Sequence, residues 1–373
     1  MKILIFSLAY QPFVGGAEVA IKEITDRLPA GSDFKFEMIT ANLDGRQKIE
    51  EKMGNVLVHR IGNGKLSKYF FPWLAYKKAV ALQKENHYDT IWAMMANQAG
   101  WAALKFKKKF PEVRYLLTLQ EGDSEWDIWL RTFLIRPIYK QIYRRADYIQ
   151  AISNFLANRA KTIGARCPIE VVPNGIKINN QETRYNNQIK NQKPTKRIIT
   201  VSRLVKKNGI EYLIRAMKNI DGELLVLGDG GLRKKLEKLA ASLNINNRIK
   251  FLGNVPYEKV YEYLSQTSVF VRPSLSEGLG NAFLEAMSVG IPVIGTRVGG
   301  IPDFLIDGET GWFCQVKNPK GLAEKINYVL DEKNKNEVEK VVENAYKMVS
   351  EKYNWNIITG HMSSIFQNLK IKN

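Results

Sequence analysis

Short β-type segments alternate with helix-type segments along most of this 373-residue chain. Such alternation predicts parallel sheets covered by helices on both faces, because parallel strands need a long crossover connection. In the first half we expect strands at Lys2–Leu8, Phe34–Thr40, Val56–Ile61, Asp89–Ala93, Val113–Leu119 and Asp147–Ile152, and helices at Ala17–Leu28, Pro72–Glu85, Asn97–Lys108 and Glu125–Arg145. In the second half we expect strands at Arg197–Val201, Glu223–Leu227, Arg248–Leu252, Ser268–Val271 and Pro292–Ile294, and helices at Ile210–Met217, Leu232–Leu243, Tyr257–Leu264 and Ala282–Ser288.

The chain is long enough for two domains, each able to bury its own core. A polar segment at residues 178–195, nearly free of aliphatic side chains, is typical of a linker. We therefore expect an α/β fold with a domain at 1–177 and a second domain at 196–352, followed by a terminal helical segment at 353–373. Ligands of open parallel sheets bind beyond the carboxyl ends of the strands, which places a site between two facing sheets.

The most informative motif is the run from Ser274 to Met287, in which Glu277 and Glu285 stand eight positions apart around a glycine turn. An apolar strand precedes the turn and a helix follows it, so Gly278, Leu279, Gly280, Asn281 and Ala282 would present unpaired N–H groups and a helix dipole to an anion. The diphosphate of a nucleotide sugar suits such a site. Glu277 could accept hydrogen bonds from the sugar and Glu285 from the ribose. Two solvated carboxylates are the simpler interpretation of this pair alone.

That run resembles the E-x7-E signature of retaining GT-B glycosyltransferases, in particular the nucleotide-sugar-dependent enzymes of family 4. The resemblance covers nearly the whole chain: it includes Tyr10–Glu18, Val171–Ile176, Val201–Leu204, Gly228–Gly230, Val298–Asp303 and Gly308–Gly311. It implies two Rossmann-like domains facing across a cleft, the first binding the acceptor and the second the nucleotide sugar. It also implies that the last helix packs back on the first domain.

Two further glycine motifs follow strands. Gly15 and Gly16 would let the backbone approach a phosphate or sugar, although a tight turn explains them equally well. Gly228 and Gly230 invite a dinucleotide-binding interpretation, but the spacing is not G-x-G-x-x-G. The family resemblance instead places them on the nucleotide side of the pocket.

The second domain also supplies candidate cations. Arg203 follows a strand, and its guanidinium could grip a diphosphate. Relatives carry a phosphate-neutralising lysine five residues beyond this arginine, where this chain has Asn208. We expect Lys207 to take that role, against the alternative that Lys206 and Lys207 form a solvated basic turn.

A second departure from the family pattern lies at Thr118–Asp123. Gln120 occupies the usual histidine position and Glu121 the glycine position, while Asp123 stays at the aspartate position. Gln120 could hold a donor hydroxyl, and Asp123 could bind an acceptor hydroxyl or merely cap a helix. The acidic stretch faintly resembles a GT-A metal motif. With cations and helix N-termini available we expect no cofactor and no metal.

The net charge of +19 needs an explanation. Residues 65–109 contain nine basic and two acidic side chains, residues 131–166 contain eight and one, and both segments are rich in aromatics. This favours contact with anionic membrane, although core aromatics and a lysine-rich composition are an alternative. Nucleic-acid binding is a lesser alternative, since no binding module accompanies the charge.

Two cysteines and no long apolar segment favour a cytoplasmic enzyme at the inner face of the cell membrane. We expect it to transfer sugar from a UDP-sugar, or second a GDP-sugar, to a saccharide or lipid-linked acceptor of the cell envelope. A nucleotide-sugar epimerase of the same fold is the alternative.

Overall fold

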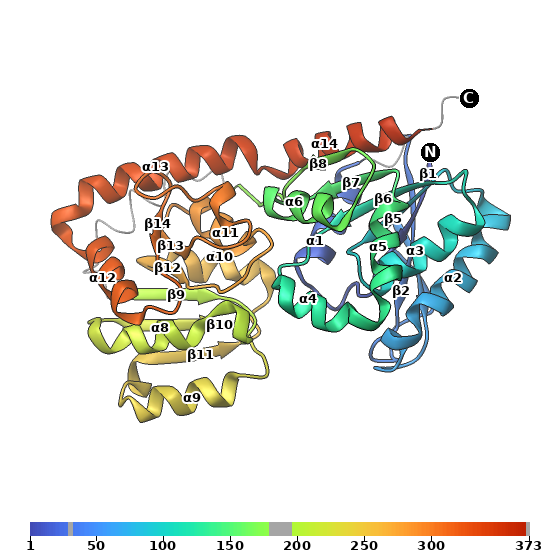
Figure 1. Cartoon of the computed structure of the whole chain (residues 1–373). Coiled ribbons are helices and arrows are strands. Elements are labelled where there is room, and N and C mark those ends of the chain that lie inside the picture. The colour runs from blue at the N-terminus through green and yellow to red at the C-terminus, as the bar shows by residue number, and fades with distance from the viewer. Residues whose placement is uncertain (29–32, 179–195, 371–373) are drawn as a thin grey trace. The chain divides into compact units, whose positions relative to one another are not determined.

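The computed structural model describes residues 1–28, 33–178 and 196–370. The chain divides into two compact units. Unit 1 comprises Met1–Glu121, Glu125–Gly175 and Trp355–Asn373, and unit 2 comprises Gly122–Ser124 and Ile176–Asn354. Apart from Ile178, the expected linker lies outside the described residues. Figure 1 shows both units as α/β layers, the architecture expected from the strand–helix alternation.

Unit 1 contains an eight-stranded sheet with the order β3-β4-β2-β1-β5-β6-β7-β8. Its strands pair in parallel except for the edge strand β3, which pairs antiparallel with β4. The strands are β1 (Lys2–Phe6), β2 (Lys35–Ala41), β3 (Glu50–Met53), β4 (Val56–Ile61), β5 (Thr90–Met94), β6 (Arg114–Leu119), β7 (Tyr148–Ala151) and β8 (Ile169–Val171). The helices are α1 (Gly16–Arg27), α2 (Ser67–Asn86), α3 (Gln98–Lys109), α4 (Glu125–Thr132), η1 (Phe133–Ile135), α5 (Arg136–Arg144), α6 (Asn154–Ile163) and α14 (Trp355–Leu369).

Alternate side chains of β1 serve two different helical layers, as the two-residue period of a strand requires. Ile3 and Ile5 belong to the buried core that also holds residues of α1 and α14. Phe6 instead meets Phe106 of α3, with ring centroids 6.2 Å apart. The C-terminal helix α14 therefore contributes to the core of the unit that begins the chain.

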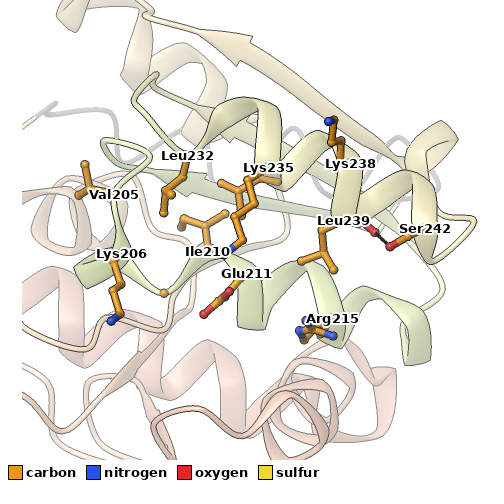
Figure 2. Close-up of a pocket in the computed structure, with 12 residues that line it drawn as sticks. Val205, Lys206, Ile210, Glu211, Arg215, Leu232, Lys235, Lys238, Leu239 and Ser242 are labelled. Carbon is orange, nitrogen blue, oxygen red and sulfur yellow. Dashed lines mark hydrogen bonds between the residues drawn. The ribbon is translucent and has the colours of Figure 1, made fainter.

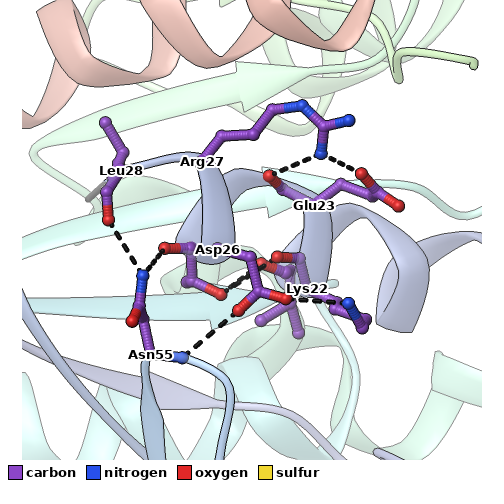
Figure 3. Close-up of polar contacts among 8 residues, drawn as sticks. Lys22, Glu23, Asp26, Arg27, Leu28 and Asn55 are labelled. Atoms are coloured by element: carbon purple, nitrogen blue, oxygen red, sulfur yellow. Dashed lines mark hydrogen bonds and ion pairs between the residues drawn. The ribbon is translucent and has the colours of Figure 1, made fainter. Parts of the chain in front are cut away.

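A small polar network joins α1 to the turn between β3 and β4 (Figure 3). Asp26 pairs with Lys22 at 2.8 Å and accepts a hydrogen bond from the backbone N–H of Asn55 at 3.2 Å. The Asn55 amide donates to the carbonyl of Leu28 at 3.1 Å. A Cβ atom at Gly54 would overlap the Asp26 carboxylate, and its φ of +55° suits glycine.

Unit 2 contains a six-stranded sheet with the order β11-β10-β9-β12-β13-β14. The strands are β9 (Arg197–Val201), β10 (Glu223–Leu227), β11 (Ile249–Gly253), β12 (Val269–Arg272), β13 (Val293–Thr296) and β14 (Trp312–Cys314). All the pairings among them are parallel. The α-helices are α8 (Ile210–Ala216), α9 (Arg233–Ser242), α10 (Tyr257–Ser265), α11 (Asn281–Ser288), α12 (Pro319–Leu330) and α13 (Lys335–Lys352), and short 3₁₀ turns include η2 (Lys206–Asn208).

The strand order of unit 2 reverses direction at β9. From β9 the chain builds outward to β10 and β11 on one side and then to β12, β13 and β14 on the other. In open parallel sheets such a switch point leaves a crevice at the carboxyl ends of the two central strands. The loops after β9 and β12 are therefore the expected place for a ligand.

Several expected elements differ from the structure. The single helix expected at Glu125–Arg145 is interrupted by η1, where Pro137 at the start of α5 cannot continue an α-helical hydrogen-bond ladder. The short strands β3, β8 and β14 and the helices α6, α12 and α13 were not predicted. Among the described residues no helix is long and apolar enough to cross a bilayer.

Candidate active site

The loops after β9 and β12 are joined at the switch point of unit 2. The backbone N–H of Leu275 donates to the carbonyl of Lys207 at 2.6 Å. Gly209 has φ +67°, and a Cβ atom there would overlap the carbonyl of Pro273. This close approach requires glycine, and it brings Lys207 and Glu277 to the same edge of the sheet.

Glu277 is held from three sides. Its carboxylate pairs with the guanidinium of Arg272 and accepts the Gly278 N–H at 3.1 Å. Its carbonyl accepts the Gly300 N–H at 3.2 Å, and a Cβ atom at Gly299 would overlap that carbonyl. The Glu277 side chain keeps 15% of its surface exposed. The carboxylate is thus fixed in position while remaining open on one side.

Arg272 was not among the predicted site residues. It ends β12, its side chain is 8% exposed, and it donates to the Val201 carbonyl at 3.2 Å. The guanidinium also lies 5.1 Å from the ring centroid of Phe283. A charged residue at the end of the apolar strand Val269–Val271, five positions before Glu277, was the signal that could have identified it.

The turn from Gly278 to Ala282 leads into α11. Gly280 precedes the helix with φ +105°, and Leu279 and Ala282 are 2% and 8% exposed. The N-terminal N–H groups of α11 begin next to Glu277, so this end of the helix favours an anion beside that carboxylate.

Glu285 occupies a different environment from Glu277. It lies about one turn into α11 and is 7% exposed. Burial raises the pKa of Glu285 to about 7, against the opposing effects of a hydrogen bond from Tyr257 and the charge of Arg272. The carboxyl group therefore titrates near neutral pH.

The predicted cations of unit 2 differ in their contacts. Arg203 is exposed and forms no ion pair with any of the described residues. The Lys207 ammonium lies 2.9 Å from the carboxylate of Asp123, and both residues belong to unit 2. Asn208 is buried at 5% exposure, and its amide donates to the carbonyl of Arg203 at 2.6 Å. Asn208 therefore stabilises the loop through this hydrogen bond, and Arg203 and Lys207 remain the candidate cations.

Gly228 and Gly230 lie against the same β9 loop. Cβ atoms at these positions would crowd the carbonyls of Ser202 and Leu204. Close packing of two loops accounts for both glycines, whether or not a nucleotide also approaches them. A cavity of about 440 Å³ lies between α8 and α9, and its lining includes Lys206 and Gly209 (Figure 2). Neither Glu277 nor Glu285 lines this cavity.

The candidate residues of unit 1 follow β1 and β6. Gly15 and Gly16 are exposed at the start of α1, and Gly15 has extended backbone. Gln120 exchanges two hydrogen bonds with Asn174, at 3.1 and 3.2 Å. This neutral amide pair closes the carboxyl end of β6.

Glu121 is a buried acid next to that pair. One carboxylate oxygen accepts the Ala96 N–H, and the other is buried without a hydrogen-bond partner among the described residues. Burial raises the pKa of Glu121, opposed by backbone N–H groups and Arg159. The glycine that relatives carry at this position would have no side chain to occupy the space that the Glu121 carboxyl group fills.

Comparisons with known proteins identify the family. Residues 14–180 match the model "Glycosyltransferase Family 4", and residues 181–348 match "Glycosyl transferases group 1". An uncharacterised glycosyltransferase of Methanocaldococcus jannaschii is 33% identical over 390 residues, covering 98% of each chain. A putative colanic acid biosynthesis glycosyltransferase, WcaL of Escherichia coli, is 28% identical over 245 residues, covering 62% of this chain and 59% of that protein.

Solved structures share the fold at low sequence identity. A sucrose-phosphate synthase of Thermosynechococcus elongatus superimposes with a TM-score of 0.85 at 22% identity, covering 99% of this chain and 98% of the other. HepE of Anabaena, in complex with UDP and glucose, gives 0.79 at 19% identity, covering 99% and 100%. The chain belongs to the GT-B glycosyltransferases of the family 4 type.

Among the described residues no cluster of three or more histidine, cysteine or acidic side chains is arranged to hold a metal ion.

Proposed function

We propose that this glycosyltransferase moves a sugar from a nucleotide-diphosphate sugar to its acceptor with retention of configuration. The observation that supports this most is the arrangement around Glu277. A fixed, partly open carboxylate stands beside the N-terminus of α11, at the switch point where a ligand of unit 2 would bind. Glu277, held by the Gly278 N–H, would orient the sugar, and the N–H groups from Leu279 to Ala282 would face the diphosphate.

In this proposal the remaining residues of unit 2 bind the nucleotide. Glu285 accepts hydrogen bonds from the ribose hydroxyls, while Arg203 and Lys207 neutralise the charge that develops on the leaving diphosphate. With these cations and the dipole of α11, the transfer would proceed without a metal ion. Residual activity in excess EDTA is the test.

For the nucleotide we propose UDP first and GDP second. Support comes from HepE, which was solved with UDP and glucose at 99% coverage of this chain, although at 19% identity. For the acceptor we propose a saccharide or lipid-linked precursor of the cell envelope, because the relative WcaL is described as a putative colanic acid glycosyltransferase.

Gln120, Asp123 and the glycines after β1 would complete the site around the transferred sugar. Asp123 would bind the attacking hydroxyl and Gln120 would contact the sugar. Asp123 already lies 2.9 Å from Lys207, and that pair would have to open or share its charge with the substrate. Gly15 and Gly16 would admit the bound sugar close to the backbone.

The proposal can be tested with a panel of UDP- and GDP-sugars. Ligand at about 100 times its Kd should raise apparent stability by about 2.7 kcal/mol, which a thermal shift detects. The anomeric configuration of the product is then read by NMR. Lys207→Ala should lower turnover more than its matched control Lys206→Ala, because only Lys207 contacts the Asp123 turn.

An isomerised donor with no new glycosidic bond would instead identify the epimerase alternative. Inversion of the anomeric centre would overturn the retaining mechanism.

A further inference from the structure

The helices α4 and η1 of unit 1 carry a continuous run of exposed apolar side chains. We define the α4 ridge as Trp126, Trp129, Leu130, Phe133, Leu134 and Ile135, all exposed. None of the described residues of α4 or η1 is buried. Leu134 is 90% exposed and Trp126 is 69% exposed. An apolar cluster of this kind on a globular protein marks a surface that another molecule covers.

The ridge has internal order of its own. The rings of Trp126 and Trp129 are stacked with centroids 5.2 Å apart, and Trp129 meets Phe133 at 5.2 Å. One aromatic stripe therefore continues from α4 into η1 rather than folding back into the core.

The charge that follows the ridge indicates the kind of partner. After Asp127 no acidic residue occurs in the sequence before Asp147, whereas Arg131, Arg136, Lys140, Arg144 and Arg145 lie between them. Tryptophan, phenylalanine and leucine beside a cationic stretch are the composition of segments that lie in the interface of an anionic bilayer.

A second aromatic surface lies at the same edge of unit 1. Tyr69, Phe70 and Trp73, at the start of α2, are 59%, 58% and 48% exposed. The helix α2 follows β4 and α4 follows β6, and both strands belong to the parallel part of the sheet. Because parallel strands end at one edge, both helices begin there. Helices α2, α3 and α5 also pack side by side, so the two surfaces can meet one plane.

We infer that the α4 ridge inserts into the interface of an anionic phospholipid bilayer, with the start of α2 lying on the same membrane surface. The ridge begins directly after the turn that carries Gln120 and Asp123. Resting on the proposed function, this position means that the acceptor is membrane-anchored and reaches that turn from the bilayer.

The test uses the full chain with extruded vesicles, either of phosphatidylcholine alone or with one part in three of phosphatidylglycerol. Flotation should show binding to the anionic vesicles only, weakened by salt. The double variant Trp129→Ser/Leu134→Ser should lower binding at least about tenfold. The matched control Ile49→Ser/Ile306→Ser removes two other exposed apolar side chains, 77% and 50% exposed, and should bind normally.

Charge is tested separately with Arg136→Glu/Lys140→Glu, which should weaken binding, against Lys108→Glu/Lys109→Glu on α3, which should weaken it less. Tryptophan fluorescence should shift to shorter wavelength on anionic vesicles, and this shift should be smaller in Trp129→Ser. Circular dichroism confirms that each variant is folded.

Absence of binding to anionic vesicles at low salt would overturn the inference, as would a ridge variant that binds like the unaltered protein. A dimer in solution that the ridge variant dissociates, without vesicle binding, would show that a second copy covers the ridge and would also overturn it. The thermal shift with UDP-sugars is measured on the same variants. A normal shift without vesicle binding rejects the membrane surface alone, whereas vesicle binding without any shift rejects the proposed donor.

Discussion

In both units the parallel strands end at one edge of the sheet, but the side chains at the two edges differ in chemistry. In unit 2 the edge carries charged partners: Arg272 with Glu277, and Lys207 with Asp123. In unit 1 the end of β6 is closed by the neutral pair Gln120–Asn174, beside an acid whose burial raises its pKa. Fixed charge stabilises developing charge best when it is already oriented. Under the proposed function, the fixed charges of unit 2 would stabilise the leaving diphosphate, and the neutral pair of unit 1 would contact the sugar.

The strongest test of this comparison is Glu277→Gln. We expect turnover to fall by about 10²–10³-fold, because the charged contact to the sugar is lost while the shape of the side chain stays. Donor affinity should change little. Steady-state kinetics and thermal shift with the donor measure both, with Glu324→Gln on the exposed face of α12 as the control. Full turnover in Glu277→Gln would remove Glu277 from the mechanism.

Arg272→Met should destabilise unit 2 by about 3 kcal/mol, because the mostly buried Glu277 carboxylate would lose its partner. Urea unfolding measures this. The double variant Arg272→Met/Glu277→Gln should recover part of the loss, since no unpaired charge then remains. Additive losses in the double variant would mean that the two side chains act independently.

Glu285 should make the stability of unit 2 depend on pH. Its pKa in the folded protein is about 7, above the ordinary value of 4.5, so the folded state binds the proton more tightly than the unfolded chain does. This contribution is fully present below pH 4.5 and is lost as the pH rises to about 7, with a total of about 3 kcal/mol. Unfolding measured across this range should show the fall. The isosteric variant Glu285→Gln should flatten it, and an unchanged profile would assign the dependence to another group.

The smallest effect on turnover and stability is expected at the Gln120–Asn174 pair of unit 1. Gln120→Glu replaces a donor by an acceptor, so it loses the hydrogen bond to the Asn174 oxygen and should cost about 1 kcal/mol. Turnover should fall less than about tenfold. If it fell as far as in Glu277→Gln, the difference drawn here between the two edges would be wrong.

The sequence predicted most of the sheet strands, because their apolar runs are long and bounded by turns. It did not predict β14, with three residues, or the edge strand β3, whose alternating exposure reflects its position rather than a strong pattern. The prediction of one helix at Glu125–Arg145 was wrong, because η1 and then Pro137 at the start of α5 interrupt it.

Burial also decides which of the basic-aromatic segments seen in the sequence form a surface. Two segments share a mixture of basic and aromatic residues, Lys105–Phe110 and Trp129–Arg136. In the first, Phe106 is fully buried and the Lys107 ammonium pairs with Asp147 at 2.8 Å, whereas Lys108 and Lys109 stay exposed, so this segment presents charge without its central aromatic ring. In the second, the aromatics are exposed. Composition alone cannot distinguish them, because the tertiary partner decides which side chains are covered. Arg272 was not predicted for the same reason, because its role follows from its tertiary contacts with Glu277 and the Val201 carbonyl.

The position of α14 has a consequence for how the protein is made. Trp355 and Phe366, 1% and 0% exposed, complete the core of unit 1, yet they follow almost all of unit 2 in the sequence. Domains generally fold as units in the order of their synthesis. Here almost all of unit 2 is translated before α14, so the unit that starts first is the last whose core can close. Until α14 is synthesised, the nascent chain would leave exposed the apolar side chains of unit 1 that α14 later covers.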